Sequence, residues 1–251
     1  MDSPDRTCVP GARLPSFDNG TEQLTRVVEV RAQQNPAESG SRTGRLVAVI
    51  GLDGAGKSSQ VRMLGEWLRS QGVPGQAHQS VTMAPVRKAL NAMAEQEGLA
   101  DHLELIGGET MRLVSACSQL ARVAAFEPIL KTSPDIVILD RFVYCQYALA
   151  KAEGVGSVDF LRRLLGNAPK PDLTIFLDVS PAEAVRRINI RGIDEESAEF
   201  LESFRSAYID LPEFTEFVSV PGDGDFETVQ LAMRQAIIDA FPENFANVAA
   251  T

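Results

Sequence analysis

The stretch VIGLDGAGKSSQ, residues 49–60, decides the fold because it joins an apolar run to a segment with helical spacing. Within it, Gly51, Gly56, Lys57 and Ser58 have the spacing of a phosphate-binding loop. Backbone N–H groups of such a loop wrap a polyphosphate, and the following helix adds the positive end of its dipole. A glycine-rich turn that binds nothing is the alternative, but the strand before and the helix after favour a nucleotide site. The residues expected to bind ATP are Gly51, Asp53, Gly54, Ala55, Gly56, Lys57, Ser58 and Ser59.

Two side chains of this loop have specific expected roles. Lys57 is predicted to bridge the β- and γ-phosphates as a catalytic residue, and the Ser58 hydroxyl is predicted to ligate Mg²⁺. We expect the Lys57 side chain to be exposed in the loop, so its replacement should change the stability of the fold little.

Short apolar runs alternate with helical segments along the chain. The runs 46–50, 136–139, 173–177 and 217–220 are rich in β-branched residues, and the first three lack polar alternation. Strands that are buried on both faces of a parallel sheet have this pattern. Strand and helix in alternation predict a doubly wound α/β sheet. The helical segments carry Val61, Leu64 and Leu68; Leu113, Ala116, Leu120 and Val123; Phe160, Leu164 and Leu165; and residues 228–240.

Composition restricts the class of protein. The chain has 251 residues, 44% hydrophobic and 23% charged, which suits one α/β domain with a tail. A formal net charge of −10 repels nucleic-acid backbones, so we expect no nucleic-acid partner. No apolar run approaches the ~18 residues of a membrane span and no secretory signal is recognised, so we expect no membrane association. The 3 cysteines are widely spaced, which argues against a disulfide framework and favours the cytoplasm.

The N-terminal part differs from the rest of the chain. Residues 1–43 are polar and contain several prolines, and residues 21–34 have the apolar spacing of one helix. We predict a partly disordered extension over 1–43 and a single phosphate-loop domain over 44–251.

A second candidate segment follows the apolar run 136–139. Asp140 and Arg141 come directly after it, and open α/β sheets bind ligands beyond the carboxyl ends of their strands. Asp140 is predicted to hold Mg²⁺ or its water shell, or to accept a proton, and is therefore a catalytic and a metal-binding candidate. Arg141 has the bidentate donors that hold a second, anionic substrate. A surface Asp-Arg pair is the alternative, less favoured beside a phosphate-binding loop.

The residues after the run 173–177 predict a capped helix. Ser180 has the position of an N-cap, Pro181 that of the first helical residue, and Glu183 completes a capping box. Gly192 has the position that ends this helix.

Two arginines of this helix suggest a lid. Arg187 and Arg191 are four residues apart and share one helix face. An arginine pair before a glycine-ended helix suits a mobile lid, here residues 186–200, that closes on a transferring phosphoryl group, and both arginines are catalytic candidates. A solvated basic surface is the alternative.

From Arg45 to Phe241 the chain resembles thymidylate kinase and related nucleoside monophosphate kinases. The resemblance is carried by GLDGAGKSSQ at 51–60, VILDRF at 137–142, PDLTIFLDVSPAEAVRRINIRG at 171–192, ESFRSAYIDL at 202–211 and VPGDGDFETV at 220–229. It implies a P-loop kinase fold, with a parallel five-stranded sheet flanked by helices. The implied reaction is phosphorylation of a nucleoside monophosphate, usually dTMP, by ATP with Mg²⁺.

The resemblance also assigns roles to individual residues. Asp53 matches a loop carboxylate that lies near the acceptor and its metal, and Arg141 matches the arginine that holds the acceptor phosphate. Family members place a catalytic arginine in the phosphate loop or in the lid. Because Ala55 occupies the loop position, Arg187 and Arg191 are expected to supply it.

The departures from the family all lie on the acceptor side. The Arg-Glu-Pro-Gly-Gly-Thr signature is missing near 79–87, Ile50 replaces a glutamate, and Ser118 stands where an acceptor-contacting arginine is usual. Past Arg141, the usual Ser and Ala-Tyr-Gln become Cys145 and residues 148–150. Arginines that could compensate are Arg87, Arg112 and Arg122.

These observations favour a Mg²⁺-ATP-dependent phosphotransferase that resembles thymidylate kinase. Its partners are expected to be ATP and a small anionic acceptor, dTMP, another nucleoside monophosphate or a small phosphorylated acid, and a homodimer is compatible with the sequence. A P-loop module that binds or hydrolyses ATP and signals to a partner is the alternative. A kinase requires a second substrate for ADP release, whereas a sensor or an ATPase does not.

Overall fold

The computed structural model describes residues 42–80, 83–192 and 196–246, which lie in one compact unit. The predicted helix at 21–34 lies outside the described residues. Arg42 and Thr43, which the sequence assigns to the extension, contact this unit. The Arg42 guanidinium donates 2.6 Å to the Asp172 carboxylate, and the Thr43 hydroxyl donates 3.2 Å to the carbonyl of Ser133.

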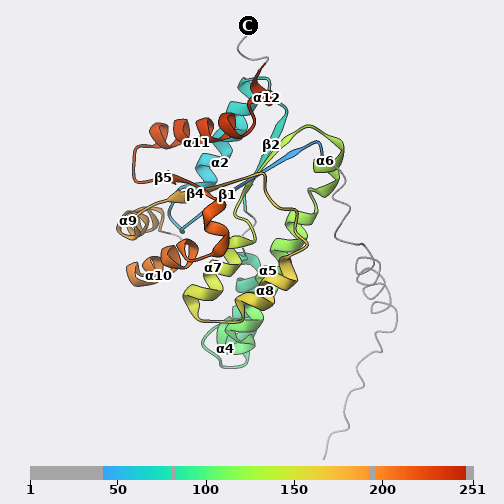
Figure 1. Ribbon diagram of the computed structural model, residues 1–251. Coiled ribbons are helices and arrows are strands. Elements are labelled where there is room, and N and C mark those ends of the chain that lie inside the picture. The colour runs from blue at the N-terminus through green and yellow to red at the C-terminus, as the bar shows by residue number, and fades with distance from the viewer. Residues whose placement is uncertain (1–41, 81–82, 193–195, 247–251) are drawn as a thin grey trace, which may run out of the picture. The chain divides into compact units, whose positions relative to one another are not determined.

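The five strands form one sheet in the order β2-β3-β1-β4-β5, and every neighbouring pair is parallel. This confirms the predicted five-stranded parallel sheet (Figure 1). Their bounds are β1 Arg45–Gly51, β2 Gly75–His78, β3 Ile136–Asp140, β4 Leu173–Asp178 and β5 Val218–Pro221.

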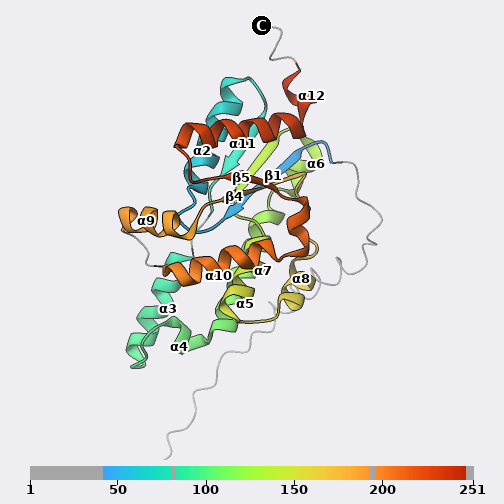
Figure 2. The same ribbon diagram turned by 60° about the vertical axis from the view of Figure 1, so that its left-hand side comes forward.

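The three central strands are the ones that apolar runs predict. Every residue of β3 is buried, and in β1 and β4 only one end residue is partly exposed, because helices cover both faces. Figure 2 shows α2 and α11 on one face of the sheet and α7 and α10 on the other.

The edge strand β2 was not predicted from an apolar run, because its sequence GQAH contains none. Tertiary contacts form it instead. A Cβ on Gly75 would lie 2.9 Å from the carbonyl oxygen of Ile136, so only glycine allows this approach to β3. The Gln76 side chain also donates to the Asp135 carboxylate at 3.1 Å.

The predicted helices are present, although some of the apolar residues that reveal them do not face the core. On α5, Ala116 and Val123 are fully buried, whereas Leu113 is 39% exposed. On α8, Phe160 is exposed while Leu165 is buried. Apolar spacing therefore located the helices better than it located their buried faces. The helices are α2 Lys57–Ser70, α3 Ala84–Gln96, α4 His102–Ile106, α5 Gly108–Ala124, α6 Glu127–Thr132, α7 Tyr144–Glu153, α8 Val158–Leu165, α9 Pro181–Arg191, α10 Ala198–Ile209, the 3₁₀ helix η1 Pro212–Glu216, α11 Phe226–Ala240 and α12 Pro242–Phe245.

One helical stretch of the described chain, Gly108–Thr132, is long and apolar enough to cross a membrane by length and composition. We expected no such stretch, because the sequence lacks an uninterrupted apolar run of that length. A single stretch of this kind is weak evidence for a span, because core helices of soluble proteins pass the same test.

Candidate active site

The phosphate-binding loop connects β1 to α2, as predicted, and its glycines are needed for steric reasons. Gly51, Gly54 and Gly56 all have positive φ angles, of 142°, 78° and 89°. A Cβ on Gly51 would lie 2.5 Å from the carbonyl oxygen of Leu177, and one on Gly54 would lie 2.5 Å from that of Ala184. Side chains at these positions would push the loop away from β4 and α9.

Lys57, the first residue of α2, is buried in this loop. The residue is 5% exposed, and Nζ donates to the carbonyl oxygen of Leu52 at 2.5 Å. Burial, with help from the charge of Arg141, lowers the pKa of Lys57 to about 8, against the opposing effect of Asp53 and Asp140. The expectation that this side chain is exposed is therefore wrong, because the curled loop covers the ammonium group with its own backbone.

Ser58 and Asp140 come together at the carboxyl ends of β1 and β3, although they are 82 positions apart. The Ser58 hydroxyl donates to Oδ2 of Asp140 at 2.6 Å, and the backbone N–H of Ser80 donates to the same oxygen at 3.4 Å. Asp140 is 1% exposed, and its Oδ1 is buried without a hydrogen-bond partner among the described residues. Hard oxygen ligands such as these suit Mg²⁺, which binds proteins through one or two side chains and keeps its other positions for water and phosphate. The residues present fit the predicted metal.

Arg141 and Asp53 form an ion pair between the end of β3 and the phosphate loop. Burial alone raises the pKa of Asp53, but the charges of Arg141 and Lys57 outweigh it and hold that pKa below its ordinary value. Burial likewise disfavours the charged form of Arg141, yet Asp53 raises its pKa overall. The pair therefore stays ionised at neutral pH, next to the loop.

Arg141 also has an unusual backbone conformation. Its φ angle is 66°, and it is the only residue other than glycine with positive φ in the described part of the chain. A left-handed conformation costs a residue with a Cβ about 1–2 kcal/mol, so the surroundings must hold it.

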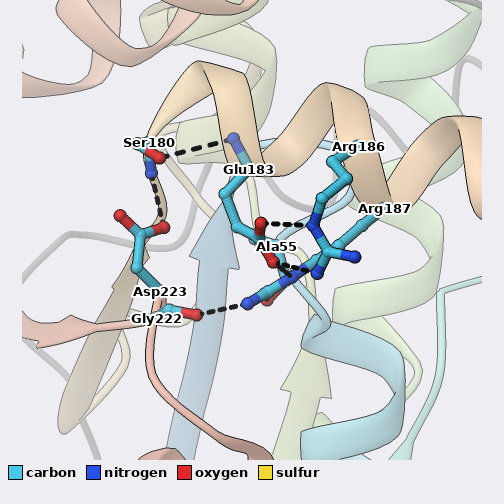
Figure 3. A network of polar contacts seen from close by, with 7 residues as sticks. All are labelled: Ala55, Ser180, Glu183, Arg186, Arg187, Gly222 and Asp223. Atoms are coloured by element: carbon cyan, nitrogen blue, oxygen red, sulfur yellow. Dashed lines mark hydrogen bonds and ion pairs between the residues drawn. The ribbon is translucent and has the colours of Figure 1, made fainter.

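Arg187, on α9, donates hydrogen bonds to three protein groups (Figure 3). Nε donates to Glu183 at 2.6 Å, Nη1 to the carbonyl of Ala55 at 3.4 Å and Nη2 to the carbonyl of Gly222 at 2.9 Å. This guanidinium joins α9, the phosphate loop and the turn after β5.

Arg191 is exposed at the end of α9, and its charge also lowers the pKa of Asp53. Gly192 ends the helix in the left-handed conformation, as predicted. Part of the expected lid, residues 193–195, lies outside the described residues.

The predicted capping box of α9 is only half formed. Ser180 Oγ accepts from the N–H of Glu183 at 3.4 Å, as expected of an N-cap. The reciprocal bond is absent, since the Ser180 N–H donates to Asp223 at 2.9 Å and the Glu183 carboxylate binds Arg186 and Arg187 (Figure 3). Hydrogen bonds from Arg186 and Arg187 lower the pKa of Glu183 to about 2. Two arginines attract this carboxylate more strongly than one N–H group.

A comparison with known sequences agrees with this geometry. The sequence model of the family described as thymidylate kinase matches residues 49–231, from the phosphate loop into α11. The chain belongs to the thymidylate kinase family. The P-loop kinase class and the fold predicted from sequence are thereby confirmed, and the comparison gives no support to the sensor alternative.

Individual members of the thymidylate kinase family are moderately similar to this chain. A probable thymidylate kinase of Thermococcus onnurineus is 33% identical over 174 residues, which cover 66% of this chain and 83% of the relative. The thymidylate kinase of Rickettsia typhi is 30% identical over 175 residues, which cover 67% of this chain and 83% of the relative. The thymidylate kinase of Synechococcus sp. is 29% identical over 207 residues, which cover 78% of this chain and 96% of the relative.

The three arginines that could compensate for the missing acceptor contacts differ in what they contact. Arg87 is exposed on α3, and Arg112 is ion-paired with Glu153 of α7. Arg122, in contrast, donates to the carbonyl oxygens of Asp140 and Arg141 at 2.7 and 2.8 Å. This contact could not be predicted from the sequence, because helix spacing does not specify which strand end a long side chain reaches.

Proposed function

We propose that the protein is a Mg²⁺-dependent kinase that transfers the γ-phosphoryl group of ATP to the phosphate of a nucleoside monophosphate. One arrangement carries this proposal. The Ser58–Asp140 pair and the Lys57 ammonium lie on the donor side of the loop, and the Asp53–Arg141 pair lies beside them at the carboxyl end of β3. A loop that only binds ATP does not need the second pair.

The donor side positions ATP and neutralises charge. The loop N–H groups and Lys57 bind the phosphates, and their positive charge is already in place when charge develops on the transferring group. Ser58 and Asp140 would hold Mg²⁺. When bound, this ion supplies further positive charge to the β- and γ-phosphate oxygens.

The acceptor side needs an anchor more than it needs a base. A phosphate monoester has its second pKa near 6, so the attacking oxygen is already largely ionised at neutral pH. Arg141 has five N–H donors and can hold an acceptor phosphate while it remains paired with Asp53. We assign Asp140 to the metal, since this reaction does not require it to accept a proton.

The two helix arginines receive different roles. Arg187 donates to Glu183, Ala55 and Gly222, so it stabilises the position of the loop that binds ATP. Arg191 is the stronger candidate for contact with the transferring group, because it is exposed and its charge reaches Asp53.

The preferred acceptor is expected to differ from the thymidylate in the family name. The relatives are named for thymidylate, but Ser118 on α5 replaces an arginine and the usual signature after β2 is missing. A charge-assisted contact contributes about 1.5–3 kcal/mol, so each loss weakens binding by roughly ten- to a hundredfold. We therefore propose a different nucleoside monophosphate or small phosphorylated acid as the preferred acceptor, with dTMP a poor one. A cytoplasmic location and a homodimer remain predictions.

The test is acceptor-dependent ADP release by the purified full chain. The protein is supplied with ATP, Mg²⁺ and, in turn, each of a panel of nucleoside monophosphates, nucleosides and small phosphorylated acids. The proposal expects release that rises at least tenfold with one phosphorylated acceptor. Release at the same rate without any acceptor would favour the sensor or ATPase and contradict the kinase.

A further inference from the structure

Helix α5 contacts the end of strand β3 through two side chains. A single nitrogen of Arg122, Nη2, donates to the carbonyl oxygens of both Asp140 and Arg141, at 2.7 and 2.8 Å. One helical turn earlier, the buried side chain of Gln119 donates to the carbonyl oxygen of Arg141 at 3.4 Å. Two side chains therefore converge on one carbonyl group.

That carbonyl belongs to the left-handed residue of the site. The N–H of Arg141 donates to the carbonyl of Val49 at 2.9 Å, so both polar groups of its backbone are held, one by β1 and the other by α5. A residue with a Cβ stays at positive φ only where such contacts determine its conformation. At the usual negative φ the chain would leave β3 in another direction and the guanidinium would no longer meet Asp53.

We propose that Arg122, with Gln119, is a positioning residue that keeps Arg141 left-handed and so aims its guanidinium at Asp53 and the acceptor. The acceptor part of this inference rests on the proposed function. The conformational part does not, because it concerns only the contacts of α5 with the end of β3.

Arg122 could also affect the acceptor without acting through Arg141, and the experiment must distinguish the two effects. Its Nε and Nη1 atoms are buried and have no hydrogen-bond partner among the described residues. Burial also lowers the pKa of this guanidinium, against the attraction of Asp140. A guanidinium with free donors could contact the acceptor directly, independently of Arg141.

A double-mutant cycle between Arg122 and Arg141 distinguishes these actions. Arg122→Met keeps an unbranched apolar side chain and removes all donors, and Arg122→Lys keeps one cationic donor group. Arg112→Met is the matched control, because Arg112 lies on the same helix and binds Gln146 and Glu153 instead of the strand end. Each variant is made in the full chain, alone and with Arg141→Ala, and assayed with the acceptor that the wild type prefers.

We expect Arg122→Met to lower kcat/KM for the acceptor at least tenfold and to leave KM for ATP within twofold. Arg122→Lys should recover part of the loss, and Arg112→Met should stay within twofold of wild type. In the Arg141→Ala background, Arg122→Met should add less than a twofold further loss, because the residue through which it acts is gone. Losses that multiply in the double variant would overturn the inference in favour of direct contact, and an unaffected Arg122→Met would overturn it outright.

A second measurement is independent of turnover. Hydrogen–deuterium exchange over residues 139–146 should be at least tenfold faster in Arg122→Met than in wild type or Arg112→Met. Unchanged exchange in that segment would refute the conformational part. If the wild type phosphorylates no acceptor at all, the proposed function fails, and the exchange result still decides whether α5 holds Arg141.

Discussion

Replacing Lys57 by methionine should separate activity from stability, since the two are expected to change in opposite directions. Lys57 is 5% exposed, and the loop covers its ammonium group. At pH 7 it is charged, and its loss removes a preorganised cation from the phosphates. Removing one such donor typically lowers kcat by about 10²–10³-fold, so we expect at least this loss.

The effect on stability follows from the lowered pKa. A shift from 10.5 to about 8 means that the folded protein disfavours the ammonium by about 3 kcal/mol. Loss of the charge-assisted hydrogen bond from Lys57 to Leu52 removes about 1.5–3 kcal/mol of stabilisation. At pH 7 the free energy of unfolding of Lys57→Met should therefore exceed that of wild type by up to about 1.5 kcal/mol.

This gain depends on pH with a definite sign. Between about pH 8 and 10.5 the unfolded wild type binds more protons at Lys57 than the folded one, so wild-type stability rises with pH. The advantage of Lys57→Met should be fully present below pH 8 and shrink above it. Urea denaturation at pH 7 and pH 10, with exposed Lys131→Met as a control, measures both values. Near-normal turnover would refute the role of the loop, and a variant less stable than wild type by 2 kcal/mol would refute the burial argument.

Three further predictions concern the phosphate loop, the acceptor side and the N-terminal segment. In wild type, kcat/KM for ATP should fall above about pH 8 as Lys57 loses its proton, whereas a flat profile to pH 10 would contradict a catalytic ammonium. Arg141→Ala should raise KM or lower kcat at least tenfold for the preferred acceptor and leave KM for ATP within twofold. In wild type, steady-state kinetics should show dTMP to be a poorer substrate than that acceptor. If dTMP is the best acceptor instead, other residues replace the missing contacts. Deletion of residues 1–40 should leave a soluble enzyme with activity within threefold of the full chain, and an insoluble or inactive product would show that this segment is part of the folded domain.

The sequence predicted those features of the fold that depend on neighbouring residues. The central strands are continuous apolar runs, and the loop from Gly51 to Ser58 requires only a local spacing. β2 could not be found in this way, because its four residues are held by Gly75 packing on β3 and by polar side chains. The five-stranded sheet was expected only from the family resemblance.

The site was predictable in its residue types but not in its contacts. Lys57, Asp140 and Arg141 could be identified as candidates from the sequence, since each lies next to a strand end or a helix start. The sequence did not predict that the loop buries Lys57, because that depends on where the carbonyl of Leu52 points. Nor did it predict the contact between Arg122 and Arg141, which requires the position of α5 relative to the end of β3.

The most direct test of phosphoryl transfer follows the γ-phosphate itself. ATP labelled at the γ-position is incubated with Mg²⁺, the full-length protein and the preferred monophosphate, and the products are separated. Label in the acceptor's diphosphate, formed in equal amount to ADP and lost in Lys57→Met, is the predicted result. Label that appears only in inorganic phosphate, at a rate unaffected by the acceptor, would contradict the assignment of this protein as a kinase.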